Sequence, residues 1–337
     1  MKVTITDIAK IANVSVATVS RVINNKSKGV SEQTRTRLLK LIEEYNFEPN
    51  AVARGLVTKK SKIIGLLIQD IANPFYPRLA KGVEEEANLR GYNIILCDGN
   101  NSEEKEVNYL DFLNKHYVAG IIYNNFNNIG DKILNIIVNN SIPLVFIDSK
   151  IDIPGIRCVY VENEKAIYEL VSYLISIGHR KIGFITGPMD SYSTNERFKG
   201  YIKVLEDNQI PIDYDLIVEG DYTIPKGYET MGILLDRKTE MTVVVCCNDL
   251  MAIGAMEMLE ERNIKVPDEM SIVGFDNIDM SRIVRPKLTT VSQPSYEMGR
   301  AAAKMLINII ENKSKKNDAS VVFLPELVIR DSVKKLN

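Results

Sequence analysis

The 337-residue sequence predicts a small all-α N-terminal domain with a helix-turn-helix, followed by an α/β body of two doubly wound parallel-sheet lobes. The first segment places apolar side chains at helical spacing. From residue 62 onward, apolar runs of strand length alternate with amphipathic stretches of helical length, which is typical of parallel sheets covered by helices on both faces. This second part is too long for one such sheet, so two lobes are expected.

Three helices are expected in the N-terminal domain. Thr6 can cap a first helix over 7–12, and Ser15 can cap a second over 16–22, because hydroxyl oxygens accept from the free N–H groups of a first turn. A third helix is expected over 32–45. A tight turn joins the first two, which together form the helix-turn-helix.

A linker region separates this domain from the body. Pro49 ends the third helix, because proline and the residue before it resist helical continuation. Residues 50–57 can form a short helix capped by Asn50, and so short a helix is marginal in water alone. The predicted organisation is therefore a helix-turn-helix domain over 1–49, a hinge helix and linker over 50–61, and a two-lobed effector-binding and dimerisation domain over 62–333.

From residue 62 onward, strand-like apolar runs alternate with amphipathic helical stretches. The helical stretches include 77–90 and 250–262. Strand-like runs are found at 63–68, 92–97, 120–123, 144–147, 182–186, 243–247 and 271–275.

Charge is divided unevenly along the chain. The net charge is −2, yet residues 1–62 hold twelve Lys and Arg against five Asp and Glu, a charge of +7, and the remainder carries −9. A basic head on an acidic body is what a DNA-binding module on a repelled effector domain needs. The alternative is a basic face that is merely solvated.

Several other classes of protein are disfavoured. No apolar run reaches membrane-spanning length and the first residues do not resemble a signal peptide, so a cytoplasmic protein without membrane contact is expected. The four cysteines lack metal-ligand spacing and are expected to be buried thiols. There is no phosphate-cradling glycine loop, nucleophile elbow or zinc spacing, so neither an enzyme nor a cofactor is expected.

The second helix carries the side chains that can read DNA. If the first helix packs across it, Val16, Ala17 and Arg21 point outward, where base edges would lie in a major groove. Arg21 can bond bidentately to guanine, while small apolar groups can touch thymine methyls. Phosphate contacts or caps suit the remaining polar side chains, which are Ser15, Thr18, Ser20 and Asn24.

An ordered series of motifs resembles the N-terminal signature of the LacI/GalR family. It comprises VTITDIAK at 3–10, VSVATVSRVIN at 14–24, and PNAVARGL at 49–56. The resemblance implies that hinge helices from two subunits pair in the minor groove, where Leu56 wedges between base pairs. The expected DNA contacts are therefore Thr6, Ser15, Val16, Ala17, Thr18, Ser20, Arg21, Asn24, Asn50, Ala53 and Leu56.

The same resemblance continues through the body to about Ser332, in phrases such as NDLMAIG at 248–254 and GFD at 274–276. It implies a fold like periplasmic sugar-binding proteins, with two lobes joined by three crossover segments and a ligand between them. Lobe 1 is expected at about 62–161 and 294–322, and lobe 2 at about 162–290 and 323–333. The chain looks most similar to ribose-operon repressors, although Ser149 stands where ribose binders often carry a second arginine.

Within that frame, candidate effector-binding residues lie where strands end and helices begin. Carboxylates, amides and an arginine can bond several hydroxyl groups, while aromatic faces cover the C–H surface of a sugar ring. Asn248 and Asp276 could instead be helix caps, and Phe75 or Tyr76 could belong to the core. The expected set is Asn73, Phe75, Tyr76, Asp148, Arg197, Tyr222, Asn248, Asp276 and Gln293.

The sequence thus predicts a repressor that binds double-stranded operator DNA as a homodimer and senses a small sugar, with a pentose such as ribose preferred. A second hypothesis keeps the DNA function but replaces the sugar by a phosphorylated carrier protein, because the hinge and Arg21 also resemble catabolite control repressors. Surface positions such as Asp70, Tyr296 and Arg300 would serve that partner. A sugar-transport protein is disfavoured by the basic head.

Overall fold

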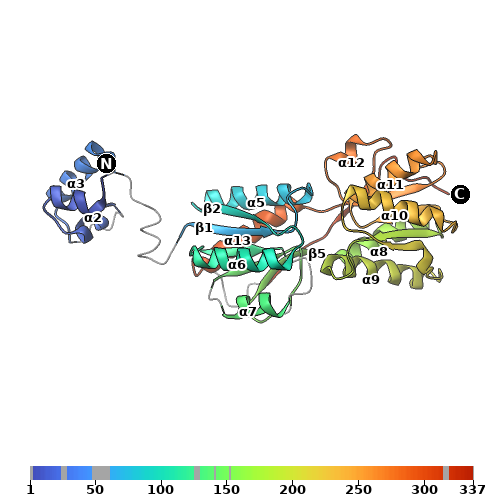
Figure 1. Ribbon diagram of the computed structural model, residues 1–337, viewed down its shortest axis with the longest axis horizontal. Helices are drawn as coiled ribbons and strands as arrows, with labels where there is room; N and C mark the ends of the chain where they lie inside the picture. Colours follow the sequence, from blue (N-terminus) through green and yellow to red (C-terminus); the bar gives the residue numbers. More distant parts are fainter. Residues whose placement is uncertain are drawn as a thin grey trace. The chain divides into compact units, whose positions relative to one another are not determined.

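The computed structural model describes residues 3–23, 29–47, 61–124, 130–139, 142–151, 153–313 and 319–336. They belong to two compact units, which divide between Ser61 and Lys62. Each unit is described by itself (Figure 1).

The N-terminal unit is a three-helix cluster around a small apolar core. Its helices are α1 (Ile5–Ile11), α2 (Val16–Ile23) and α3 (Glu32–Glu44). The core side chains come from all three helices and are less than a tenth exposed, namely Ile8, Ala9, Val19, Val22 and Leu38. The predicted all-α domain is therefore confirmed.

The start of α1 differs from the prediction. Thr4, not Thr6, is the N-cap: the Thr4 hydroxyl oxygen accepts from the Asp7 N–H at 3.3 Å, and the Asp7 carboxylate accepts from the Thr4 N–H at 3.0 Å. This reciprocal capping box satisfies two donors at once, which a cap at Thr6 cannot do. Thr6 is an exposed residue in the first turn of the helix.

The first lobe of the body contains a six-stranded parallel sheet in the order β11-β5-β4-β3-β1-β2. Its strands are β1 (Ile63–Ile68), β2 (Asn93–Asp98), β3 (Gly120–Tyr123), β4 (Leu144–Ile147), β5 (Arg157–Val161) and β11 (Val321–Phe323). Its helices are α5 (Phe75–Leu89), α6 (Glu103–Lys115), α7 (Asp131–Asn139) and α13 (Ser295–Ile310).

Strand β1 shows how this sheet is covered on both faces. Ile64, Leu66 and Ile68 pack into the cluster that contains α5 and α13. Leu67 points the other way, into the cluster with side chains from α6 and α7. Alternation with a period of two therefore buries both faces of one apolar run, as expected for a doubly wound sheet.

The second lobe repeats the architecture, with the strand order β12-β10-β9-β8-β6-β7, and only β12 pairs antiparallel. Its strands are β6 (Ile182–Thr186), β7 (Ile217–Glu219), β8 (Val243–Cys246), β9 (Ser271–Asp276), β10 (Thr289–Ser292) and β12 (Glu326–Val328). Its helices are α8 (Asn163–Ser176), α9 (Tyr192–Asp207), α10 (Ile224–Asp236), α11 (Asp249–Glu261) and α12 (Met280–Ile283), with a short 3₁₀ turn at Tyr214–Leu216.

The chain passes between the two sheets three times, after β5, after β10 and after β11. The last passage follows Phe323, which ends β11 in the first sheet. Five strands, β5, β7, β10, β11 and β12, were not among the predicted runs. They are three to five residues long, and most carry polar side chains.

All four cysteines are buried free thiols, as expected. Among the described residues, no helix is long and apolar enough to cross a membrane. The described chain also contains no cluster of three or more residues that could hold a metal ion.

Candidate DNA-reading helix and interlobe cavity

Helix α2 has one buried face and one exposed face. Val19 and Val22 are buried against α1 and α3, while Val16 is 42% exposed and Ala17 and Arg21 are also exposed. The structure therefore brings the three predicted base-reading side chains to the free surface of one short helix, as a recognition helix requires.

The turn before α2 is fixed by local bonds. Asn13 adopts a left-handed backbone conformation (φ 50°), and the Arg37 guanidinium of α3 donates to the Ala12 carbonyl at 2.6 Å. Ser15 caps α2 as predicted, because its hydroxyl oxygen accepts from the Thr18 N–H at 3.2 Å. Ser20 is half-buried on the same helix.

Four predicted DNA contacts lie outside the described residues. They are Asn24, Asn50, Ala53 and Leu56.

All nine predicted effector residues line a single cavity between the two lobes, here called the inner cavity. They come from the ends of strands and from the helices that follow: Asp148 follows β4, Asp276 ends β9, and Arg197 projects from α9. This is the edge of parallel sheets where ligands commonly bind.

Two further residues line the inner cavity that sequence reasoning missed, Gln69 and Ser193. Gln69 directly follows β1 and accepts a hydrogen bond from the Tyr76 hydroxyl, so the rule of polar residues at strand ends would have found it. Ser193 lies in the first turn of α9, 3.3 Å from the Tyr222 hydroxyl, and no sequence signal singles it out.

Arg197 is held rigidly at the centre of the site. It is 2% exposed, its Nε donates to the Asn163 side-chain oxygen at 2.9 Å, and its Nη1 donates to the Cys247 carbonyl. The guanidinium also stacks over the Phe275 ring at 3.8 Å, a favourable cation–π geometry. A buried charge fixed in this way presents its remaining donors in a set direction.

Two buried acceptors in the inner cavity have no hydrogen-bond partner in the described chain. One is Oδ1 of Asp148, and the other is Oε1 of Gln293, whose Nε2 donates to Asp276 at 2.7 Å. Leaving a buried acceptor unsatisfied costs about 1–3 kcal/mol, so a ligand that donates a hydrogen bond to either atom is favoured.

Burial also perturbs the two carboxyl groups. It raises the pKa of Asp148 to about 6 and the pKa of Asp276 to about 7, and the nearby Arg197 guanidinium only partly offsets this rise. Both groups therefore change charge near neutral pH.

The backbone is strained at the same place. Asp148 (φ 57°), Tyr222 (φ 71°) and Asp276 (φ 114°) adopt left-handed conformations that non-glycine residues rarely take. Such strain gathers at binding sites, where the surrounding fold holds it in place.

Some site residues also have structural roles, as the alternatives anticipated. Asn248 caps α11, because its Oδ1 accepts from the Met251 N–H at 2.9 Å, while its Nδ2 donates to the Tyr222 carbonyl at 2.9 Å. Phe75 and Tyr76 are each 5% exposed and meet edge to face, and they belong to the core of the first lobe. These three residues line the inner cavity while serving the fold.

The inner cavity is narrow. About 290 Å³ between the side chains is free of protein atoms, but the volume open to water molecules is only about 20 Å³. The smaller of these two volumes measures what can enter the cavity, and it corresponds to about one water molecule. Any larger ligand requires the lobes to part or the side chains to move.

The residues considered for a protein partner are engaged within the first lobe. The Tyr296 hydroxyl donates to Glu85 at 2.5 Å, and Arg300 donates to Glu86 at 3.0 Å, so α13 is bonded to α5. Asp70 accepts from the Ala72 N–H in the loop after β1.

Comparison with known proteins places this geometry in a family. Residues 4–50 match the family described as bacterial regulatory proteins, lacI family, and residues 61–326 match periplasmic binding proteins and the sugar binding domain of the LacI family. Catabolite control protein A from Priestia megaterium is 36% identical over 336 residues, covering 99% of this chain and all of that protein.

Two solved structures of LacI family regulators resemble this chain in fold. The lac repressor dimer bound to operator and an anti-inducer aligns with a TM-score of 0.85 at 27% identity, covering 98% of this chain and 99% of that one. A LacI family regulator from Enterococcus faecium with bound ribose aligns with a TM-score of 0.73 at 29% identity, covering 82% and 100%.

These relatives are transcription regulators rather than enzymes. A special resemblance to ribose-operon repressors is not shown by them. The chain belongs to the LacI family of bacterial regulatory proteins and is a DNA-binding transcriptional repressor with a sugar-binding domain.

Proposed function

We propose that a small sugar bound in the inner cavity controls the affinity of this repressor for its operator. The observation that carries the proposal is the pair of buried, unpartnered acceptors, Oδ1 of Asp148 and Oε1 of Gln293, beside a rigid guanidinium. Sugar hydroxyls are donors as well as acceptors, so one polyol can satisfy the carboxylate, the amide and Arg197 together.

Aromatic side chains complete this chemistry. Phe75, Tyr76 and Tyr222 line the same cavity and offer apolar surface to the C–H faces of a sugar ring. The ribose-bound relative supports a pentose as the first candidate. Ser149, which is buried beside Asp148, stands where ribose binders often carry a second arginine. Because this difference could favour another sugar, hexoses are tested as well.

A change in the arrangement of the two lobes would couple sugar binding to DNA binding. Because the inner cavity has room for only about one water, a sugar changes the separation or the rotation of the two lobes when it binds. A ligand moves the DNA equilibrium only if it has different affinities for two conformations, and a cleft that must open provides them. Whether the sugar releases or strengthens DNA binding follows from which conformation suits the operator.

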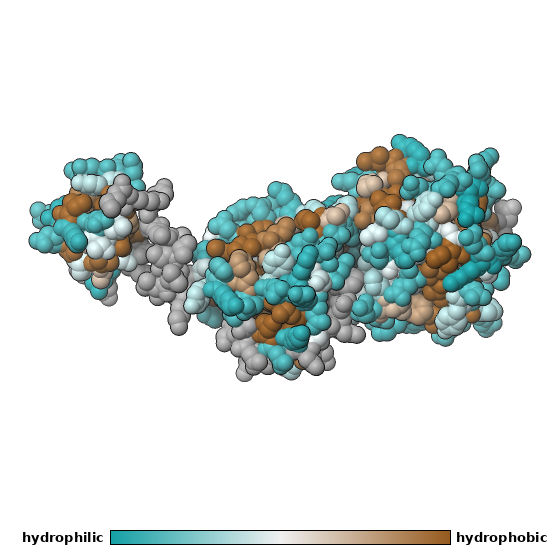
Figure 2. Space-filling model, viewed as in Figure 1, coloured by the Kyte–Doolittle hydropathy of each residue, from teal (hydrophilic) through white to brown (hydrophobic). Residues whose placement is uncertain are grey.

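DNA recognition is assigned to Val16, Ala17 and Arg21 of α2, acting in a homodimer on a pseudo-palindromic site in the cytoplasm. A second copy of the chain would cover apolar residues left exposed on the first lobe. Leu89 is 74% exposed, and Leu96, on the edge strand β2, is 41% exposed. Figure 2 shows an apolar band over the part of the first lobe that contains α5 and β2.

A second candidate is control by a phosphorylated carrier protein, which the 36% identity to a catabolite control protein favours. In that case Asp70, Tyr296 and Arg300 would form part of the docking face. Tyr296 and Arg300 already bond to α5, so docking would have to use or replace these bonds.

Calorimetry on the full-length protein with a panel of pentoses and hexoses tests the proposal. At least one sugar is expected to bind wild type and to lose at least tenfold in affinity to Asp276→Asn, because the carboxylate that accepts its hydroxyl is gone. Arg21→Ala is the matched control, since it alters only the DNA-binding unit. Failure of every neutral sugar to bind, with repression instead dependent on a carrier protein, would favour the second candidate.

A further inference from the structure

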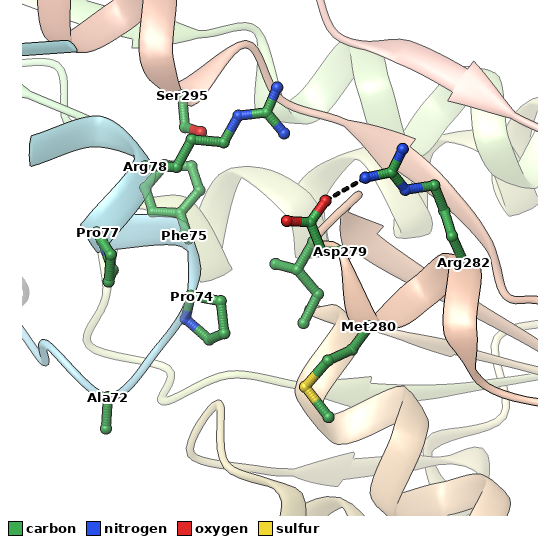
Figure 3. Close-up of a pocket in the computed structure, with 10 residues that line it drawn as sticks. Ala72, Pro74, Phe75, Pro77, Arg78, Asp279, Met280, Arg282 and Ser295 are labelled. Atoms are coloured by element: carbon green, nitrogen blue, oxygen red, sulfur yellow. Dashed lines mark hydrogen bonds and ion pairs between the residues drawn. The ribbon is translucent and has the colours of Figure 1, made fainter. Parts of the chain in front are cut away.

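A second and larger cavity lies between the lobes and shares Phe75 with the inner cavity. We call it the outer cavity; its volume open to water is about 740 Å³. It is lined by the start of α5, the segment from the end of β9 into α12, and the first residue of α13 (Figure 3). The ring of Phe75 thus lines both a narrow polar cavity and a much larger one.

The two cavities differ in charge. The inner cavity contains Asp148 and Asp276 against one cation, Arg197. The outer cavity contains Arg78 and Arg282 against one carboxylate, Asp279, which is bonded to Arg282.

Arg78 supplies the uncompensated charge of the outer cavity. It is exposed, projects from the first turn of α5, and has no ion-pair or hydrogen-bond partner among the residues that the structure describes. In Figure 3 its guanidinium reaches toward the side of the cavity where Asp279 and Arg282 lie. An anion in this space would meet a free guanidinium from the first lobe and a second one from the other lobe.

The beginning of α13 adds an independent donor. Ser295 lines the outer cavity and is 3% exposed, yet its hydroxyl has no hydrogen-bond partner in the described chain. No side chain caps this 16-residue helix, since Pro294 occupies the N-cap position. A free hydroxyl that lines the cavity at the positive end of a long helix is suited to an anionic oxygen.

We propose that the outer cavity is an anion subsite, and that the effector is a sugar carrying a phosphate or carboxylate group. The ring would lie in the inner cavity, and the anionic group would project past Phe75 toward Arg78 and Ser295. This assignment rests on the proposed function, because it extends the same ligand out of the same site.

Electrostatics fixes this orientation. An anionic group placed inside would face two carboxylates, while two donors of Arg197 are already used by Asn163 and Cys247. Placed outside, the same group gains the charge of Arg78 and the dipole of α13, each worth about two- to fivefold in affinity at an exposed site. The neutral and anionic forms of one sugar therefore differ in affinity by about three- to thirtyfold.

Calorimetry on the full chain, at low salt, compares ribose with ribose 5-phosphate, glucose with glucose 6-phosphate and glucose with glucuronate. The anionic member of at least one pair is expected to bind about three- to thirtyfold more tightly, and added salt should reduce the difference. Preference for the phosphates alone identifies a phosphate subsite. Preference that includes glucuronate identifies a general anion subsite.

Two variants assign the effect to the outer cavity. Arg78→Gln should reduce the preference by about two- to fivefold and leave the affinity for the neutral sugar unchanged, because Arg78 does not line the inner cavity. Lys81→Gln is the matched control: it removes the same charge from the same helix, where Lys81 pairs with Glu84 and Glu85.

The outcomes separate the two proposals. Equal affinities for neutral and anionic sugars in wild type, or an equal loss of both in Arg78→Gln, would overturn the anion subsite and leave the sugar site standing. If no sugar of either kind binds, the proposed function fails. Inorganic phosphate then still tests the subsite alone, through millimolar binding that Arg78→Gln abolishes and Lys81→Gln spares.

Discussion

Sugar affinity should depend on pH, because the two carboxyl groups of the inner cavity titrate near neutrality. Hydroxyl groups of a sugar donate to a carboxylate, so the ligand binds the ionised forms of Asp276 and Asp148. Burial raises the pKa of Asp276 to about 7 and that of Asp148 to about 6 in the free protein. Affinity should therefore rise with pH, and protons should be released on binding.

The magnitude follows from the ionised fractions. A group with a pKa of about 7 is roughly 10% ionised at pH 6 and roughly 90% at pH 8, which is about a tenfold change in apparent affinity. A pKa of about 6 contributes a further factor of about two over the same interval. Together the two groups predict a gain of about twentyfold between pH 6 and pH 8.

Calorimetry in two buffers of different ionisation enthalpy measures both the affinity and the number of protons released. Asp276→Asn should flatten most of the profile above pH 6.5, because Asp148 alone then titrates. An affinity that is constant across this range, or that falls as pH rises, would refute the assignment of these carboxylates as acceptors of sugar hydroxyls.

The stability of the unliganded protein should show the opposite trend. The folded state holds these protons to higher pH than the unfolded chain does, so stability should fall as pH rises from about 4 to 7, and Asp276→Asn should lessen the fall in thermal melting. Arg21→Ala should cost about 1–3 kcal/mol for each guanine contact and relax specificity at that base pair; gel shifts in which all sequences weaken equally would make Arg21 a phosphate contact. Thr4→Ala should destabilise the N-terminal unit by about 1 kcal/mol, whereas Thr6→Ala should change it by less than about 0.5 kcal/mol; the reverse order in thermal melts would contradict the capping box.

The architecture could be predicted because its central strands are fully buried. Runs such as Ile63–Ile68 and Val243–Cys246 need apolar side chains on both faces, so they stand out in the sequence. Strands β10 and β12 cannot be recognised in this way, because polar side chains interrupt their apolar residues. Their pairing is determined by the neighbouring strands. The cap at Thr4 was missed for a local reason, since two threonines precede the same helix and only the reciprocal bond with Asp7 selects one.

The nine cavity residues were found from strand ends together with a family resemblance, and the same signal would have included Gln69. The sequence could not reveal that Asp148 and Gln293 keep unpaired acceptors, because that depends on every neighbour in three dimensions. Nor could it reveal that the inner cavity is narrow, or that Arg78 and Ser295 line a second cavity from separate helices.

The central claim is that sugar binding and operator binding are coupled through the two lobes, and reciprocity tests it most directly. Operator affinity is measured by fluorescence anisotropy with and without saturating sugar, on a duplex selected from a random pool, and sugar affinity is measured with and without that duplex. The account predicts that both ratios agree and lie at about 5- to 150-fold, as linkage requires. Two ratios of one, with sugar and operator each binding normally, would contradict it.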